Sequence, residues 1–278
     1  MYTKEVNIKE SLKSDCKSCF GLCCVALFFS KSEGFPVDKI AGKPCINLND
    51  DFKCKVHKDL NIKGLKGCLA YDCFGAGQKV SQVTYSGESW RDNPHTSKEM
   101  YEVFVIVRQL HEMLWYLTEA ISLQSDLEIK KNVQSLIQKT EEFTKSNSQA
   151  ILKIDLISHR FEVNKFLLET SKSIRNKVKK KNSNHLKAKN KFSLMGKDLR
   201  KTELIGENLS GSFLIAANLS GVDLSFTDLI GADLRDTNIR GADLSNSIYL
   251  TQAQINSAKG DYNTRLPKSL IRPSHWAK

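Results

Sequence analysis

Residues 217–246 are ANLSG VDLSF TDLIG ADLRD TNIRG ADLSN, six successive five-residue units that share one layout. Each unit has Leu or Ile at its third position, Asp or Asn before it, and mostly a small residue first. The same period extends on both sides, with a large apolar residue at Leu199, Leu204, Leu209, Leu214, Leu219, Leu224, Leu229, Leu234, Ile239, Leu244 and Tyr249. A period of five fits neither an α-helix nor a β-strand. It therefore indicates a repeat architecture.

These units resemble the A(D/N)LXX units of bacterial pentapeptide-repeat proteins. The resemblance implies four units per coil of a right-handed quadrilateral β-helix, with the leucines stacked in its centre. The C-terminal region 195–278 is therefore expected to be a pentapeptide-repeat solenoid with a C-terminal cap. Thr251 and Gln254 have the spacing of a capping box, which would open a short helix over the last coil.

Residues 94–175 are expected to be helical, because apolar residues recur there at spacings of three and four. Pro94 suits a helix start, and a second helix is expected over 126–145. A third is expected from about 148 to 174, with core candidates Ile151, Ile154, Ile157, Phe161 and Phe166. Helices with such stripes bury them against each other, which predicts a small bundle.

A basic linker is predicted over 176–194. Residues 171–191 contain nine Lys or Arg and no Asp or Glu. Like charges and low hydrophobicity favour a solvated spacer. Nucleic-acid binding through 172–191 is allowed but not favoured, because no aromatic residues alternate with the lysines to stack on bases.

The region 1–93 is rich in cysteine: all eight cysteines of the chain lie between 16 and 73. Together with one histidine they have the spacings of metal ligands, and the predicted ligands are Cys16, Cys19, Cys23, Cys24, Cys45, Cys54, His57, Cys68 and Cys73. Thiolate and imidazole suit zinc, whereas thiolates alone suit an iron–sulfur cluster. Zinc is favoured, and buried unliganded cysteines or disulfides are the remaining alternatives.

The start, with Cys16, Cys19, Cys23 and Cys24, resembles the CxxCxxCC family of zinc- or iron-chelating proteins. Three residues separate Cys19 from Cys23, where the family's name implies two. The resemblance covers about residues 16–73. It implies a metal-binding head, and it leaves the grouping of the ligands open.

No run of about 18 apolar residues is present, so no membrane-spanning helix is expected. The first residues lack the apolar centre of a secretory signal, which favours a cytoplasmic protein. Because no acid/base or nucleophile constellation is recognisable, we expect a non-catalytic metal-binding scaffold that presents its repeat surface to a protein partner. One alternative is an iron–sulfur or metal-dependent enzyme that acts on a protein. Another is a topoisomerase-protecting mimic of DNA, although 196–250 carry a net charge of only −3. A homodimer is also allowed.

Overall fold

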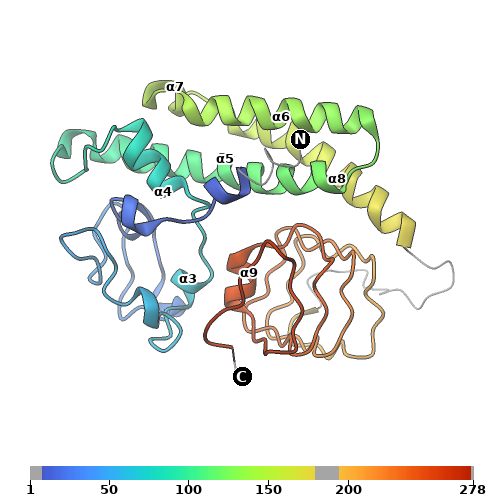
Figure 1. The fold of residues 1–278 in the computed structure, drawn as a ribbon. Coiled ribbons are helices and arrows are strands. Elements are labelled where there is room, and N and C mark those ends of the chain that lie inside the picture. The colour runs from blue at the N-terminus through green and yellow to red at the C-terminus, as the bar shows by residue number, and fades with distance from the viewer. Residues whose placement is uncertain (1–7, 179–193, 277–278) are drawn as a thin grey trace. The chain divides into compact units, whose positions relative to one another are not determined.

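The computed structural model describes residues 8–178 and 194–276 (Figure 1). The chain divides into two compact units, Met1–Cys68 with Asp72–Leu167, and Leu69–Tyr71 with Leu168–Lys278. Most of the predicted basic linker, together with most of the segment considered for nucleic-acid binding, falls at 179–193 and lies outside the described residues.

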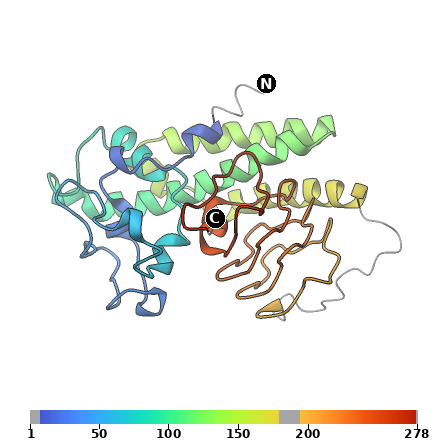
Figure 2. The ribbon, with the colours of Figure 1, turned by 60° about the horizontal axis from the view of Figure 1, so that its bottom comes forward.

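The first unit contains the helices α5 (Ser97–Leu123), α6 (Leu127–Lys145), α7 (Ser148–Leu152) and the start of α8 (Leu156–Val178). Figure 2 shows α5 and α6 running side by side, as in Figure 1. The Asp126 side chain accepts hydrogen bonds from the first amides of α6, and Asn147 caps α7 in the same way. The predicted helical middle of the chain is confirmed.

The predicted core face of the third helix is partly wrong. Ile157 and Phe161 are 84% and 78% exposed, whereas His159, Val163 and Leu167 are buried. The reason is a break in the helix: α7 ends at Leu152 and α8 begins only at Leu156. The apolar residues expected to share one face from Ile151 onward therefore do not lie on the buried face of α8.

The cysteine segment folds into short elements joined by loops. These are η1 (Cys16–Ser18), α2 (Leu22–Ala26), η2 (Lys31–Glu33), η3 (His57–Asp59), α3 (Lys66–Leu69), α4 (Ala76–Lys79), η4 (Val80–Thr84) and η5 (Pro94–Thr96). Small clusters such as Phe29, Phe35 and Leu65 supply its core. A core this small stabilises the segment only weakly, so other cross-links between its loops would add to its stability.

The repeat region is built from β-turns that recur every five residues. The amide three residues after a central Leu or Ile donates to its carbonyl, as Val222 does to Leu219 at 3.1 Å. Two residues after the Leu the backbone is left-handed at most units, and Gly occupies that position at Gly206, Gly211, Gly221, Gly231 and Gly241. These features define type II turns. Single bridges then pair residues twenty apart, such as Asp198 with Asn218 and Asn218 with Asn238.

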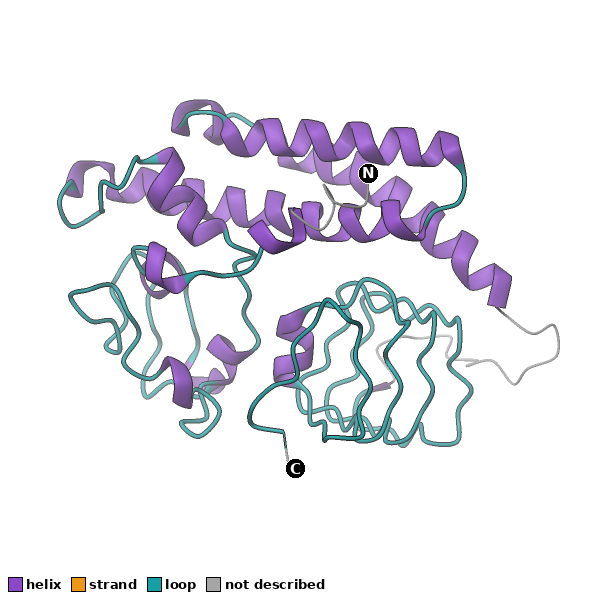
Figure 3. Cartoon of the chain, viewed as in Figure 1, coloured by secondary structure: helices purple, strands orange, loops and turns teal. Residues whose placement is uncertain are grey.

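The prediction of a C-terminal β-helix is therefore wrong. No β-strand or sheet occurs in the part of the chain that the structure describes, and Figure 3 draws the repeats as loop. The physical reason is the turn within every unit. It leaves one residue per unit free to bridge, whereas a strand needs a run of paired residues. The leucines of the repeat are nevertheless buried, most of them completely.

Threonines at the small position, two residues before a central leucine, form hydrogen bonds between distant units of the repeat. Thr227 Oγ1 donates to the Leu204 carbonyl at 2.7 Å, and Thr237 Oγ1 donates to the Leu214 carbonyl at 2.7 Å. Both donors are completely buried. Each bond therefore spans 23 residues of sequence inside the repeat.

Replacing Thr227 by Val is expected to lower the free energy of unfolding by about 1 kcal/mol, because one buried hydrogen bond is lost without a change of shape. Urea unfolding of both variants measures the effect. Thr202→Val is the matched control, since Thr202 has the same position in its unit, two residues before a central leucine, but is only half-buried. Equal losses for the two variants would contradict the assignment.

The C-terminal cap follows the predicted capping box. The amide of Gln254 donates to Thr251 Oγ1, and Gln254 Oε1 accepts from the amide of Thr251, at the start of α9 (Gln252–Ser257). Trp276 is buried and donates from its indole to the Ala258 carbonyl at 3.1 Å. The predicted capping box is confirmed.

Candidate metal centre

Aromatic side chains bring the cysteine loops together. Phe20, between Cys19 and Cys23, packs against Phe52, with ring centroids 5.3 Å apart. The Trp90 indole donates to the Phe20 carbonyl at 2.8 Å. Loops that are distant in sequence are thereby held side by side, which positions their cysteines.

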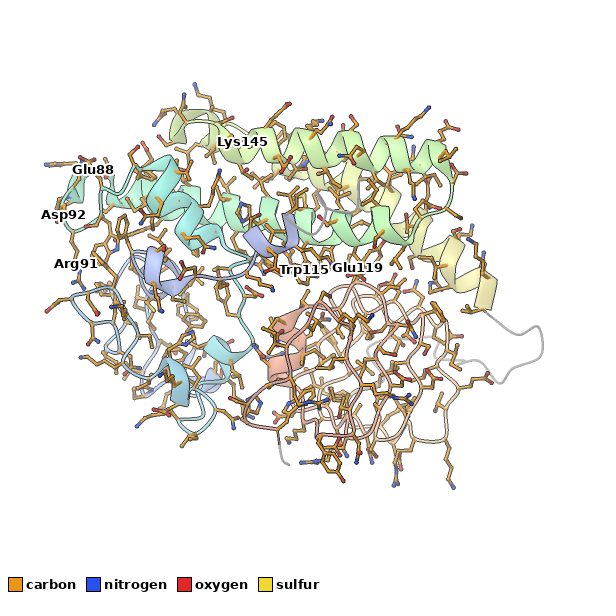
Figure 4. The ribbon with its side chains drawn as sticks, viewed as in Figure 1. Glu88, Arg91, Asp92, Trp115, Glu119 and Lys145 are labelled. Atoms are coloured by element: carbon orange, nitrogen blue, oxygen red, sulfur yellow. The ribbon has the colours of Figure 1, made fainter. Side chains whose placement is uncertain are left out.

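Arg91 reinforces this arrangement (Figure 4). Its guanidinium lies over Phe52 and donates to the carbonyls of Asp50 and Asn49 at 2.9 and 3.2 Å. A further contact joins it to the Asp50 carboxylate at 3.1 Å. Elsewhere in the same unit, the labelled Glu119 pairs with Lys9 at 3.3 Å. Arg91 thus fixes the loop that leads into Cys54.

Cys23, Cys24 and Cys54 are connected through their sulfur atoms. Gly21, with a φ of 66°, is the N-cap of α2, and the two adjacent cysteines are the second and third residues of that helix. Their Sγ atoms are 3.9 Å apart, and Cys24 also shares a hydrogen bond with Cys54. Two thiolates on one zinc ion, each about 2.3 Å from it, lie roughly 3.8 Å apart in a tetrahedral site. This pair therefore has the spacing of two zinc ligands.

The protons in this group are unevenly shared. Hydrogen bonds from Cys24 lower the pKa of Cys23 and bring the pKa of Cys54 to about 6. The same bonds, together with burial, raise the pKa of Cys24. Cys23 and Cys54 are therefore the thiols that ionise first, and the thiolate is the form that binds metals.

Cys16, Cys19 and Cys73 form a second group around Cys23. Burial raises the pKa of Cys16 and of Cys19 to about 12, and the charge of Cys23 adds to both shifts. Backbone amides of Leu22 and Gly21 donate to Cys19, and Ser14 Oγ lies 3.1 Å from the Cys73 sulfur. Such donors stabilise the anionic sulfur that a metal requires.

The remaining predicted ligands are Cys45, Cys68 and His57. Cys45 and Cys68 are half-buried against the cluster of Phe29, Phe35 and Leu65, and burial raises the pKa of Cys68 to about 12. His57 is exposed at the start of η3. Its charge contributes a small lowering to the pKa of Cys54.

The predicted ligands do not form one closed site. Over residues 8–178 and 194–276, no group of three or more His, Cys, Asp or Glu side chains is placed so that it could hold a metal ion. The donor set fits zinc in its chemistry and, at Cys23 and Cys24, in its spacing. A third and a fourth ligand would have to rotate toward that pair. A zinc ion bound there would supply a structural cross-link between loops.

Lys39 is a feature of this region that sequence analysis missed. Its ammonium group is buried and donates to the carbonyls of Val25 and Leu27. Burial lowers its pKa, and the nearby Cys24 and Cys45 act in the opposite direction. No pattern in the sequence marks this lysine among the many that are exposed.

Gly77 in α4 gives the first prediction for this site. A Cβ atom there would lie 2.5 Å from the Cys19 sulfur. Ala normally stabilises a helix by about 1 kcal/mol relative to Gly. Here Gly77→Ala is expected to destabilise the protein by about 1–2 kcal/mol, because Cys19 must move. Urea unfolding measures this, and in a Cys19→Ala background the same change should be neutral or stabilising. A more stable single variant would contradict the contact.

His111 gives a prediction about pH. Its Nδ1 atom lies 2.7 Å from the Phe74 carbonyl, to which it donates, and burial lowers its pKa from 6.5 to about 4. The unfolded chain therefore binds a proton at a higher pH than the folded chain does. Stability from the neutral imidazole is complete above pH 6.5 and is lost as the pH falls toward 4, by on the order of 3 kcal/mol.

The measurement is urea unfolding of the wild type and of His111→Gln between pH 7.5 and 4 (about the range in which imidazole titrates). The difference between the two free energies of unfolding isolates His111 from the other groups that titrate. We expect this difference to shrink as the pH falls. A constant difference would show that His111 does not titrate in this way.

The repeat carries a basic column on one side. The bridges align Asp198, Asn218, Asn238 and Lys259 in one row. Arg200 and Arg240 each follow that row by two residues and are exposed. Asp198 is the acid within the row, and it pairs with Arg200 at 2.7 Å. Cations therefore outnumber acids along this column.

Two comparisons place the chain among known proteins. The family model for pentapeptide repeats matches residues 217–248 with eight copies. That match does not reach the cysteine segment, so the CxxCxxCC resemblance stays a prediction. No helix of the described residues is both long and apolar enough to cross a bilayer. The uncharacterized protein YybG of Bacillus subtilis (strain 168) is 56% identical over 274 residues, covering 97% of this chain and 96% of that protein. The chain therefore belongs to the same family as YybG and carries pentapeptide repeats in its C-terminal part.

Proposed function

We propose that the protein is a non-catalytic metal-binding repeat protein. The cysteine segment holds zinc through thiolates, and the repeat region offers a surface to a protein partner. The observation that carries the proposal is the group of Cys23, Cys24 and Cys54, with two sulfurs 3.9 Å apart. The resemblance of the segment to the CxxCxxCC family supports the same assignment.

The chemistry around the sulfurs also supports metal binding. All eight cysteines are free thiols. The charge of Cys23 contributes to the raised pKa values of five of them, namely Cys16, Cys19, Cys24, Cys68 and Cys73. The charge of Cys54 in turn acts to raise the pKa of Cys23. Unliganded cysteines of a core are usually scattered small apolar side chains. Several thiols near Cys23 favour metal ligands instead.

Metal analysis of protein purified without oxygen tests this proposal. We expect about one or two zinc ions per chain, no visible absorption, and release of zinc when Cys23 and Cys24 are both replaced by Ser. His95→Gln is the control, because His95 is exposed and lies outside the cysteine segment. Iron with sulfide and a visible band would instead favour the iron–sulfur enzyme. Protein without metal would refute the proposal.

The topoisomerase-protecting alternative is disfavoured by the small net charge of the repeat, which is only −3 over residues 196–250. A mimic of DNA must present many acidic groups in regular rows. The bridges align Asp223 with Asp243 in one row, but the row of Asp198, Asn218, Asn238 and Lys259 is flanked by Arg200 and Arg240. We expect the full-length protein at micromolar concentration to leave quinolone inhibition of gyrase unchanged. Relief of that inhibition would revive the alternative.

A further inference from the structure

Asp228 differs from the other acids of the repeat in its burial. It stands immediately before a central leucine, and at this position of their units Asp198 and Asp223 are exposed. Only 1% of Asp228 is exposed. Its Oδ1 atom accepts from the Ile230 amide at 3.0 Å, which closes a local turn. The burial of the second carboxylate oxygen therefore depends on a contact beyond its own unit.

That contact comes from the end of α8, Leu168–Val178, which belongs to the same compact unit as the repeat. Ser171 Oγ donates to Asp228 Oδ2 at 2.5 Å, and both side chains are buried. Arg175 Nε donates to Ser171 Oγ at 3.0 Å. Because Ser171 accepts from the guanidinium group, its own hydroxyl proton is directed to the carboxylate. A cation, a hydroxyl and a carboxylate thus join the end of α8 to the repeat.

The two sides of this contact have opposite charge. Glu207 and Asp228 are the two buried acids among the described residues, and they are adjacent in the repeat, where the Asp228 amide donates to the Glu207 carbonyl at 3.0 Å. The end of α8 contains three Lys or Arg and one Glu, which gives a net charge of +2. Buried acids need an opposite charge or hydrogen bonds. This part of the repeat therefore fits a basic helix.

The end of α8 buries few apolar atoms in this contact. Ile174 is the one buried apolar residue of Leu168–Val178, and Leu168 itself is 56% exposed. Thr170 and Ser171 are the other buried residues of the segment. Apolar burial is the main source of stability in such contacts. The segment is therefore held chiefly by its hydrogen bonds and charge.

We propose that the row of Asn208, Asp228 and Ile248, which the bridges align, is a docking surface for a basic helix, and that the end of α8 occupies it as an intramolecular cover. This assignment rests on the proposed function, in which the repeat offers a surface to a protein partner, and it names that surface and the chemistry of the partner. The partner helix presents a hydroxyl or a cationic donor to Asp228. It binds only when the end of α8 is displaced, so the contact is autoinhibitory.

A purely structural role for the end of α8 makes a different prediction. If the segment were a permanent part of the repeat, its amides would exchange with solvent only when the whole repeat unfolds. A cover opens by itself, and its amides exchange while the repeat stays folded. Hydrogen exchange of the full chain distinguishes the two cases by comparing residues 168–178 with residues 217–224.

The experiment compares the wild type with Asp228→Asn and Asp223→Asn. In the wild type we expect residues 168–178 to be less protected than 217–224. Asp228→Asn keeps the size and the acceptor oxygen but removes the charge, so exchange in 168–178 should quicken roughly tenfold while 217–224 keep the wild-type rate. Asp223→Asn is the matched control, because Asp223 has the same position in its unit but is exposed. It should change neither segment.

A second measurement probes the surface itself. Ser171→Ala removes the donor from the cover and leaves the row intact. A fluorescent peptide with the sequence of residues 168–178 should bind this variant roughly tenfold more tightly than the wild type, because a tethered competitor acts at a millimolar effective concentration. The same peptide carrying Ser171→Ala is the control and should bind more weakly.

Each of three results would overturn the inference. Exchange of 168–178 only together with 217–224 would make the segment an integral part of the repeat. Equal effects of Asp228→Asn and Asp223→Asn would remove the role of Asp228. Equal binding of the peptide to the wild type and to Ser171→Ala, or binding to neither, would show that the row is not a docking surface. No readout here involves a metal, so zinc content tests the proposed function separately.

Discussion

A Cys24→Ala variant is expected to bind zinc roughly 100-fold more weakly than the wild type. Structural zinc sites bind with about 10–16 kcal/mol, so one ligand of four accounts for about 3 kcal/mol, or two powers of ten. Cys24 is the best single residue to replace, because its sulfur forms hydrogen bonds with both Cys23 and Cys54. Chelator competition at fixed pH measures the change.

Cys16→Ala is the matched control for this prediction. Cys16 belongs to the second group, with Cys19 and Cys73, although it opens the CxxC pair in the sequence. If the site is centred on Cys23, Cys24 and Cys54, removing Cys16 should cost less affinity than removing Cys24. The reverse order would place the metal at the CxxC pair and would contradict the grouping of Cys23, Cys24 and Cys54.

The cysteines themselves could be found from their spacing, but their grouping could not. Cys54 lies 30 positions after Cys24, and a loop held by Arg91 and Phe52 brings them together. Lys39 is a still clearer case, since its burial and its hydrogen bond to the Val25 carbonyl depend on the direction of one side chain. Contacts of this kind arise from tertiary packing, which leaves no local pattern in the sequence.

For the repeat, the sequence predicted burial better than it predicted the backbone. A period of five correctly identified the buried leucines, because one side of every unit must face inward. The glycines two residues after the leucine carried a second signal that was overlooked. Gly221 and Gly231 have positive φ, and Phe226 adopts the same conformation without being glycine. A left-handed residue in most units indicates turns rather than strands.

Leu219→Ala is expected to destabilise the repeat by about 4 kcal/mol. Leu219 is completely buried, and its backbone amide bonds to the Asn238 carbonyl at 2.8 Å. The row of bridges places Leu199 and Ile239 on either side of it, so few atoms can move in to fill the space. Leu→Ala changes in such rigid cores fall at about 3–5 kcal/mol, because transfer and cavity terms add.

Hydrogen exchange read over residues 217–248 measures this loss in the repeat alone, without contributions from the helical unit. Ile215→Ala is the matched control, since Ile215 stands next to a central leucine but is only half-buried. We expect exchange in the repeat to quicken by several hundredfold for Leu219→Ala (about 1.4 kcal/mol per factor of ten) and by less than tenfold for the control. Similar exchange in both variants would mean that the central leucines are not what holds successive turns together. Stability would then rest on the turn and bridge hydrogen bonds and on the buried threonines.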